Sequence, residues 1–306
     1  MNNTKSTFLI QDLEILSGIK AHTIRIWEKR YNLLQPDRKN RNVRIYDLES
    51  LQKLLNISVL NHAGHKISNI AKLSDEEIAK QAKETAQQDI SENYLIHEVL
   101  MAMFSFDEAA FERIYQSEIK KKGFEELFIT VYAPVLCHIG VLWQTDAIKP
   151  VHEHFLTNLL HQKITAQTQG LKALKVNTED YMHVLFLSQG EMHQIGMLFL
   201  NYLMRKKGLH TLYLGSNIPL GNLSELKTQF ANIVWVNRMV IDKTEQEKED
   251  ILIALTSIME GSKDKCWLIG KHWFDNSNKD LGSRQIEYFE NFEIFAKKHD
   301  LIKSIV

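Results

Sequence analysis

The chain has 306 residues, of which 44% are hydrophobic and 25% charged, and a formal net charge of −1. These values exclude a disordered or low-complexity chain, and the length predicts two or three folded domains. No apolar run reaches the ~18 residues of a membrane span, and no signal core follows a basic N-terminus, so we expect a cytoplasmic protein without membrane contact. The two cysteines, Cys137 and Cys266, lack metal-site spacing and are expected to be reduced core thiols.

The charges are distributed unevenly along the chain. Residues 1–73 contain 12 Lys and Arg against 6 Asp and Glu, a net charge of +6, whereas the remainder contains 25 against 32, a net charge of −7. A basic N-terminal part on an acidic body indicates that only the N-terminal part meets nucleic acid.

The first two predicted helices are Phe8–Ser17 and Ala21–Tyr31, joined by a turn at Gly18. In the second helix, apolar residues spaced i, i+3 and i+7 form one buried stripe, while Arg25 and Lys29 project from another face. We therefore expect a helix with an apolar inner side and a cationic outer side.

A basic hairpin is predicted to follow the second helix. Pro36 ends the helical region because proline lacks a backbone donor and disfavours helix in the residue before it. The Arg-rich segment that comes next closes on Val43–Tyr46, where apolar and polar residues alternate as in a short strand. The expected arrangement is a helix-turn-helix with a wing.

These residues carry a family resemblance. The pattern Ile24-Arg25-x-Trp27-Glu28-x-Arg30-Tyr31, followed by Arg44-x-Tyr46, resembles the DNA-binding head of MerR-type transcription regulators over roughly residues 6–73. In that family the helix enters the major groove and the wing grips the flanking backbone of double-stranded operator DNA. The resemblance implies DNA contacts from eight residues: Thr23, Arg25, Lys29, Arg30, Lys39, Arg41, Arg44 and Tyr46. A merely solvated charged face is the alternative, but aromatic residues among the basic ones favour nucleic acid.

Two further helices complete this head, one capped by Asp47 and running to about His62, and a short one at Ile67–Leu73. The strongly polar segment Ser74–Gln88, in which Ile78 is the only large apolar residue, predicts an exposed linker helix over residues 75–90. Since no sustained heptad pattern is present there, assembly into a dimer or tetramer must use other parts of the chain.

The next region is helical throughout. Four helices with short connections predict an antiparallel four-helix bundle over residues 91–176. Their expected bounds are Tyr94–Phe104, Phe106–Lys122, Phe124–Trp143 and Pro150–Leu174.

Beyond this bundle, short apolar runs alternate with amphipathic segments. The runs are Met182–Ser188, Thr211–Gly215, Ile233–Val236, Cys266–Gly270 and, more weakly, Ile286–Phe289. This alternation predicts a doubly wound parallel sheet. The fold class is therefore a multidomain α and α/β protein: a winged helix-turn-helix (1–74), a linker helix (75–90), a four-helix bundle (91–176) and a Rossmann-like (flavodoxin-like) domain (177–306).

The loop after the first predicted strand of this sheet contains candidate binding residues. Ligands of such sheets bind outside the carboxyl ends of the strands, and this loop reads Gly190-Glu191-Met192-His193-Gln194-Ile195-Gly196. A carboxylate that orients a histidine is the usual support for a metal ligand. The loop resembles the Asp-x-His-x-x-Gly signature of cobalamin-binding Rossmann-like domains, with Glu191 in place of Asp. In that family the histidine, here His193, is the axial ligand of the cobalt.

A second motif lies in the predicted bundle. Trp143 precedes the pair Glu153-His154 by nine intervening residues, as in the helical cap of light-sensing cobalamin regulators of the CarH type. Those regulators also join a MerR-type head, a four-helix bundle and a Rossmann-like domain in this order. The resemblance implies adenosylcobalamin as cofactor and a set of binding residues: Trp143, Glu153, His154, Ser188, Glu191, His193, Gly196, Gly215, Ser216 and Gly270.

Three departures from that pattern bear on cofactor binding. Asn237 and Arg238 stand in the region of a Ser-x-Leu motif, and Lys271 replaces the second glycine of a Gly-Gly pair. In the family these small residues accommodate the buried nucleotide tail of the cofactor, and a lysine in an apolar channel would obstruct it. Gln144 stands where the light sensors carry a histidine that ligates cobalt after photolysis.

Two other functions stay open. A MerR-type regulator that has lost cobalamin binding would be controlled by a protein partner or by constitutive oligomerisation. A corrinoid carrier in methyl transfer is the enzyme alternative, which the DNA-binding head disfavours, so we expect a regulator and no enzyme. Taken singly, His193 also fits a hydrogen-bonded loop histidine, and His152 and His154 fit the polar face of a helix.

Overall fold

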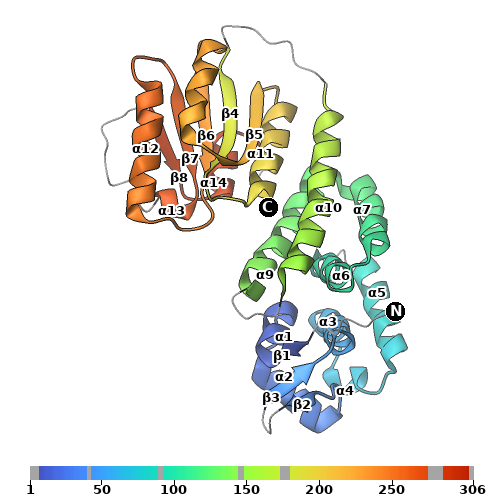
Figure 1. The fold of residues 1–306 in the computed structure, drawn as a ribbon. Coiled ribbons are helices and arrows are strands. Elements are labelled where there is room, and N and C mark those ends of the chain that lie inside the picture. Colours follow the sequence, from blue (N-terminus) through green and yellow to red (C-terminus); the bar gives the residue numbers. More distant parts are fainter. Residues whose placement is uncertain are drawn as a thin grey trace. The chain divides into compact units, whose positions relative to one another are not determined.

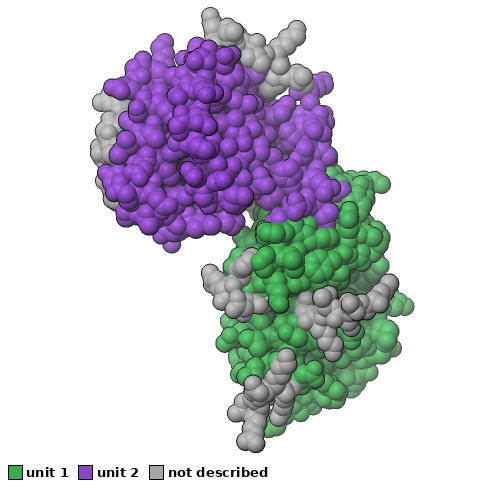
Figure 2. Space-filling view, viewed as in Figure 1, with its two compact units in different colours: residues 1–156 green, residues 157–306 purple. Residues whose placement is uncertain are grey.

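The computed structural model describes residues 7–39, 43–88, 92–143, 148–172, 180–274 and 285–302. The chain divides into two compact units, Met1–Leu156 and Thr157–Val306 (Figure 2).

The first unit begins with a small three-stranded sheet and continues with helices (Figure 1). Its elements are β1 (Phe8–Leu9), α1 (Ile10–Ser17), α2 (Ala21–Tyr31), β2 (Asp37–Lys39), β3 (Val43–Tyr46), α3 (Leu48–His62), α4 (Ile67–Ile70), α5 (Asp75–Gln88), α6 (Glu92–Ser105), α7 (Glu108–Lys122), α8 (Phe124–Leu127), the π-helical turn η1 (Phe128–Tyr132), α9 (Ala133–Trp143) and the start of α10 (Pro150–Gln169).

The N-terminal head is a winged helix-turn-helix, as predicted. Gly18 ends α1 in the left-handed conformation, and α2 has the predicted bounds, with Ile24 and Trp27 buried. The sheet order is β1-β3-β2. The strand β1 was not predicted: its two residues pair with Tyr46 and Ile45 of the wing, so the first helix begins two residues later than expected.

The polar helix α5 differs from the expected exposed linker. It packs against α3, and Ile78 and Ala82 are 1% and 0% exposed. An ion pair between Lys53 of α3 and Asp75 of α5, at 2.7 Å, joins the two helices at the start of α5. Helix α5 is therefore packed into the first unit, and the packed side of this helix is a narrow apolar edge.

Helices α6, α7, α9 and α10 follow in the order predicted for the bundle. The predicted helix Phe124–Trp143 consists of α8, η1 and α9 in succession, and α10 ends at Gln169 rather than at Leu174.

Among the described residues, one run, Phe124–Leu142, is long and apolar enough to cross a membrane, with a mean hydropathy of 1.4. Core helices pass the same test, and Val131 in this run is fully buried in the unit. Cys137 of α9 is exposed, contrary to the expected core thiol, whereas Cys266 is buried.

The second unit contains a five-stranded parallel sheet of order β5-β4-β6-β7-β8. Its strands are β4 (Met182–Ser188), β5 (Thr211–Ile218), β6 (Ile233–Arg238), β7 (Lys265–Ile269) and β8 (Ile286–Phe289), and its helices are α11 (Gln194–Lys206), the 3-10 helix η2 (Leu220–Thr228), α12 (Glu245–Met259), α13 (Lys271–Phe274) and α14 (Phe292–Lys298). This order confirms the predicted flavodoxin-like fold.

Apolar side chains cover both faces of this sheet. On one face, Phe186 and Trp235 pack with Leu255 of α12 and Leu223 of η2. On the other face, Trp267 packs edge-on against Phe295 of α14. Burial on both faces explains why the strands read as continuous apolar runs in the sequence.

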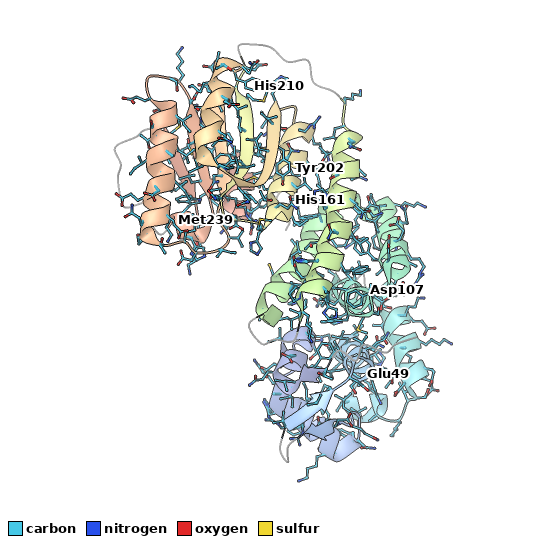
Figure 3. The ribbon with its side chains drawn as sticks, in the orientation of Figure 1. Glu49, Asp107, His161, Tyr202, His210 and Met239 are labelled. Atoms are coloured by element: carbon cyan, nitrogen blue, oxygen red, sulfur yellow. The ribbon has the colours of Figure 1, made fainter. Side chains whose placement is uncertain are left out.

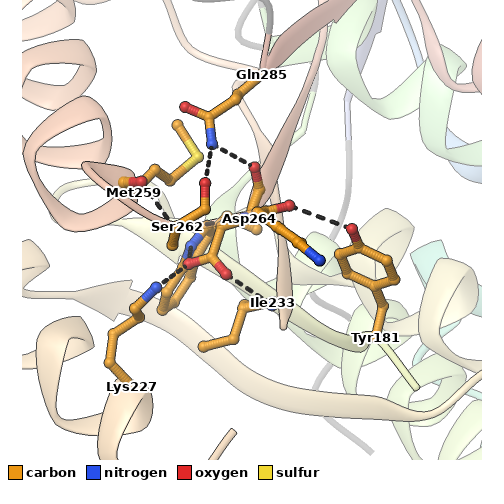
Figure 4. A network of polar contacts seen from close by, with 9 residues as sticks. Tyr181, Lys227, Ile233, Met259, Ser262, Asp264 and Gln285 are labelled. Carbon is orange, nitrogen blue, oxygen red and sulfur yellow. Dashed lines mark hydrogen bonds and ion pairs between the residues drawn. The ribbon is translucent and has the colours of Figure 1, made fainter. Parts of the chain in front are cut away.

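A buried carboxylate fixes the amino ends of the strands (Figure 4). Asp264 is 0% exposed, accepts a hydrogen bond from the backbone N–H of Ile233 at 2.9 Å and pairs with Lys227 at 2.5 Å. Gln285 donates to the backbone oxygens of Ser262 and Asp264, at 2.9 Å in each case. These contacts all lie at the edge of the sheet opposite to the carboxyl ends, so their role is structural.

Candidate DNA-binding face and candidate cofactor site

The outer face of α2 is cationic. Because Ile24 and Trp27 face the core, the side chains of Arg25, Lys29 and Arg30 are exposed, and Thr23 is partly exposed. Ile26 adds an apolar group to this face at 53% exposure. An exposed helix with basic and apolar groups suits contact with phosphates and with base edges in a major groove.

Glu28 connects α2 to the wing, which the sequence did not indicate. Its Oε2 accepts a hydrogen bond from Arg44 Nε at 2.9 Å, and its Oε1 accepts one from the hydroxyl of Tyr46. Tyr46 is 1% exposed, and burial followed by the hydrogen bond to Glu28 raises its pKa. The available signal was that Glu28 is the only acidic residue of a basic helix.

We call the two hydrogen bonds of Glu28, with Arg44 and with Tyr46, the clamp. It changes the roles that the sequence predicted for these two wing residues. Tyr46 was expected to contact the DNA backbone, but its ring is in the core and its hydroxyl is committed to Glu28. Arg44 is also engaged by Glu28, although a third of its side chain is exposed. Arg41 lies outside the described residues, and for Lys39 the structure describes only the backbone, which pairs with Val43.

The predicted loop of the second unit brings Glu191 and His193 together. Glu191 Oε1 lies 2.7 Å from His193 Nδ1 and accepts the backbone N–H of His193 at 3.0 Å. Glu191 Oε2 accepts the backbone N–H groups of Val240 and Ile241 at 2.8 and 3.0 Å. One buried carboxylate thus holds the histidine and also joins the loop after β4 to the loop after β6.

The electrostatics of this pair favour a fixed ring orientation. Burial alone would raise the pKa of Glu191, but the hydrogen bonds from the side chain and backbone of His193 and from the two backbone N–H groups lower it to about 2. The carboxylate is therefore ionised at neutral pH. It favours the proton of His193 on Nδ1, which makes Nε2 the nitrogen with a lone pair for a metal.

The pair lies at the position where the order of the sheet reverses. Strand β4 lies between β5 and β6, so the chain leaves it in one direction and later returns on the other side. Ligands of doubly wound sheets bind there, outside the carboxyl ends. Met239, at the start of the loop after β6, marks this edge in Figure 3, and His210, next to the start of β5, marks the opposite edge.

The surroundings of His193 are partly apolar. His193 has a side chain that is 51% exposed, and the neighbouring Met192 and Ile241 are 62% and 49% exposed. Exposed apolar groups around a supported histidine suit a flat ligand that is itself largely apolar.

The predicted glycines of this site have different surroundings. A Cβ at Gly196 would lie 2.6 Å from Nη1 of Arg238, so the arginine side chain rests against the first turn of α11. A Cβ at Gly270 would lie 2.2 Å from the carbonyl oxygen of Met239, so this glycine permits a close backbone approach. Gly215 adopts a φ of +91° within β5, followed by the partly buried Ser216, and Ser188 is 2% exposed.

Lys271, expected as an obstacle in an apolar channel, is exposed at the start of α13. Arg238 is another residue that departs from the family pattern, and its side chain contacts the predicted binding residue Gly196. Asn237 is fully buried, where it donates to the backbone oxygen of Phe186 and accepts from Trp273 Nε1 at 3.0 Å. Asn237 therefore stabilises the sheet.

The helical motif belongs largely to the first unit. Nδ1 of His154 lies 2.6 Å from Oε2 of Glu153 at the start of α10, and the side chain of His154 is 69% exposed. His152 is buried, accepts the backbone N–H of Lys149 and stacks on Phe106, so it is a capping residue of this helix. The side chain of Trp143 and the whole of Gln144 lie outside the described part of the chain.

Comparisons with known proteins identify two regions of the chain. Residues 8–77 match the family described as MerR HTH family regulatory protein, and residues 95–166 match the family described as B12 binding domain. Two proteins of Myxococcus xanthus are similar over most of the chain. The HTH-type transcriptional repressor CarH is 24% identical over 81% of this chain and 84% of its own length, and the repressor CarA is 22% identical over 71% of each.

The fold also resembles a solved structure. The monomethylamine corrinoid protein of Methanosarcina barkeri aligns with a TM-score of 0.52 and 13% identity, over 69% of this chain and 99% of that protein. At this identity the likeness shows the fold alone.

The residues at the sheet edge fit a corrinoid in part. A single histidine supported by a carboxylate would serve as one protein ligand of a cobalt that a corrin ring already holds. Among the described residues, no group of three or more His, Cys, Asp or Glu that could hold a metal occurs. The space beside Gly196, by contrast, is filled by Arg238.

Proposed function

We infer that this chain is a MerR-type transcription regulator with a B12-binding sensor region, since one family covers its head and the other its helical region. The observation that carries the sensor function is the Glu191–His193 pair, held at the carboxyl edge of the sheet by the loop after β6. A regulator needs an input site and a DNA-binding surface, and the chain supplies a candidate for each.

The head binds double-stranded operator DNA in this proposal. Thr23, Arg25, Lys29 and Arg30 on the outer face of α2 contact bases and phosphates, and the wing residues Lys39 and Arg41 contact the flanking backbone. Arg44 and Tyr46 act through Glu28, because they fix the wing relative to α2. The relatives named transcriptional repressors support repression as the output.

In this proposal the second unit would hold a corrinoid, with His193 as the residue that would bind its cobalt. The group would supply a cobalt centre with an upper ligand that can be exchanged, which is the source of a light response in regulators of the CarH type. This chain's own residues orient the histidine, keep its Nδ1 protonated and present Met192 and Ile241 beside it. The other contacts that the resemblance implies, from Trp143, Glu153, His154, Ser188, Gly215, Ser216 and Gly270, belong to this proposal. We also propose a cytoplasmic homo-oligomer, a dimer or tetramer, that acts as a regulator and not as an enzyme.

An absorbance spectrum tests the sensor function. The purified protein is incubated in the dark with adenosylcobalamin, and separately with aquocobinamide, and freed of unbound ligand, beside His193→Ala treated in the same way. We expect a retained corrinoid with a histidine-ligated spectrum in the parent protein and its loss in the variant. Retention of neither corrinoid by the parent protein would refute the sensor function and leave the head as the functional part.

A cofactor-independent regulator is the second candidate, favoured by the Arg238 side chain beside Gly196. In that case a protein partner or constitutive oligomerisation controls the protein. It predicts that His193→Ala changes neither operator affinity in cell extract nor the mass measured by light scattering. A change in either quantity would exclude it.

A further inference from the structure

Arg238 occupies a defined place beside the first turn of α11. A Cβ built on Gly196 would lie 2.6 Å from Nη1, 3.0 Å from Cζ and 3.4 Å from Nη2 of Arg238, so the whole guanidinium group lies against the glycine. Any side chain at residue 196 would have to displace it. The glycine thus makes room for the arginine in this chain.

The elements around the guanidinium group are held firmly. Arg238 is the last residue of β6, pairs with Ile269 of β7, and is followed by Met239, whose N–H donates to the Ile269 oxygen at 3.0 Å. Helix α11 cannot withdraw from it easily, because Met197 and Leu198 next to the glycine are buried in the core. Another group can enter beside Gly196 only if the arginine side chain turns away.

The neighbouring surface is open by comparison. His193 has half of its side chain exposed, and Met192 and Ile241 are exposed beside it. The site therefore has two parts, an accessible edge around His193 and a filled space beside Gly196, three residues further along the chain.

We propose that Arg238 is a specificity-determining residue that makes this site select corrinoids with a short or absent lower tail over complete cobalamin. The proposal rests on the proposed function, since it takes His193 as the ligand of a corrinoid. The resemblance places the nucleotide tail of cobalamin among small residues in whose region Arg238 stands, and here the guanidinium group of Arg238 occupies the space beside Gly196. A tailless corrinoid keeps the ring and the cobalt but needs no such space.

The test compares aquocobinamide, which lacks the nucleotide, with hydroxocobalamin. Each is titrated into the full-length protein and followed by absorbance, with Arg238→Ala, the matched control Lys206→Ala and His193→Ala in parallel. Lys206 lies in the last turn of α11, the helix that contains Gly196, and is exposed. Thermal unfolding and operator binding of each variant establish that it is folded.

We expect the parent protein and Lys206→Ala to bind cobinamide about tenfold or more tightly than cobalamin, a difference of about 1.4 kcal/mol or more. Arg238→Ala should gain cobalamin affinity by a similar factor without a change for cobinamide, and His193→Ala should lose the ligated spectrum with both. Equal affinities in the parent protein, or weaker cobalamin binding by Arg238→Ala, would overturn the proposal and leave the sensor function intact. If no protein retains either corrinoid, the sensor function fails, and the proposal with it.

Discussion

At the scale of single residues, both candidate sites depend on a carboxylate that organises groups distant in the sequence. Glu28 joins α2 to two residues of the wing, and Glu191 joins His193 to the backbone of Val240 and Ile241. Buried carboxylates with complete hydrogen bonding hold such groups in one geometry.

Replacement of Glu28 should loosen the wing. Glu28→Gln keeps the shape but removes the charge that pairs with Arg44. We expect a loss of roughly 1–3 kcal/mol in the free energy of unfolding, because hydrogen bonds to a charged group are weakened, together with weaker operator binding. Urea denaturation and fluorescence anisotropy with operator DNA measure the two effects. The control is Glu49→Gln, an exposed residue at the start of α3, and equal effects of the two variants would contradict the clamp.

Arg25 tests the DNA-binding face directly. Its side chain is exposed on α2, so Arg25→Ala should leave the free energy of unfolding unchanged. Operator binding should weaken by ~1–3 kcal/mol if the residue reads a base. The matched control is Lys72→Ala, an exposed basic residue of the head outside α2. Unchanged affinity for Arg25→Ala would remove this residue from the contact surface.

Glu191 should give the protein a distinctive acid sensitivity. Its pKa is lowered from 4.5 to about 2 in the folded state, so the stabilisation is present above pH 4.5 and is lost as the pH falls from there toward 2. The shift corresponds to about 3 kcal/mol of the free energy of unfolding. Glu191→Gln should remove this pH dependence, measured by urea denaturation at pH 7, 4.5 and 3.5. A variant whose stability falls as steeply as that of the parent protein below pH 4.5 would refute the assignment.

At the scale of elements, local patterns predicted most helices and strands. The spacing of Ile24 and Trp27 predicted α2, and the apolar run Met182–Ser188 predicted β4 with its observed bounds. The strand β1 was not predicted from the sequence because two residues carry no periodicity, and it forms only through pairing with β3, far along the chain. The packing of α5 was not predicted because Ala82 adds little to an apolar pattern yet is fully buried.

The candidate sites show the same limit. His193 and its carboxylate are two residues apart and were predicted, whereas the backbone groups that hold Glu191 are about 50 residues away. The contact of Arg238 with Gly196 joins the end of β6 to the start of α11 and could not be derived from spacing alone.

Three histidines lie where the head meets the helical region of the first unit. His97 of α6 bonds to the backbone of Leu16 in α1 and interacts electrostatically with His138 of α9 and His62 of α3. Among the described residues, the buried Nδ1 atoms of His97 and His138 have no hydrogen-bond partner. Burial first, and then the neighbouring histidines, lower the pKa of His97 to about 4.

This histidine should make the first unit sensitive to mild acid. Below pH 6.5 the unfolded chain binds a proton at His97 that the folded protein does not bind, so stability falls with pH until about pH 4. Between pH 7.5 and 5 we expect His97 to account for a loss of about 2 kcal/mol. His97→Gln keeps a donor for Leu16 without titrating and should remove that part of the loss, measured by urea denaturation. The exposed His65→Gln is the control, and equal pH dependence in the two variants would contradict the effect of His97.

At the scale of the whole molecule, the basic head and the acidic remainder of the chain contain different candidate sites. The net charge of +6 in residues 1–73 and −7 elsewhere directs DNA to the head, and the supported histidine is in the second unit. A ligand of the second unit can change DNA binding only if it binds one state of the protein better than another.

Mutations in the two candidate sites should have different effects on DNA binding and on corrinoid binding. His193→Ala should leave the operator affinity of the ligand-free protein unchanged, because residue 193 lies in the second unit and not in the DNA-binding head, but it should abolish any change in that affinity on addition of aquocobinamide or adenosylcobalamin. Arg25→Ala should do the reverse: operator affinity falls with and without corrinoid, while corrinoid binding measured by absorbance stays as in the parent protein. By reciprocity, operator DNA should shift the corrinoid affinity of the parent protein by the same factor as the corrinoid shifts operator affinity. An operator affinity that does not change when the parent protein binds a corrinoid would show that the two sites are not coupled.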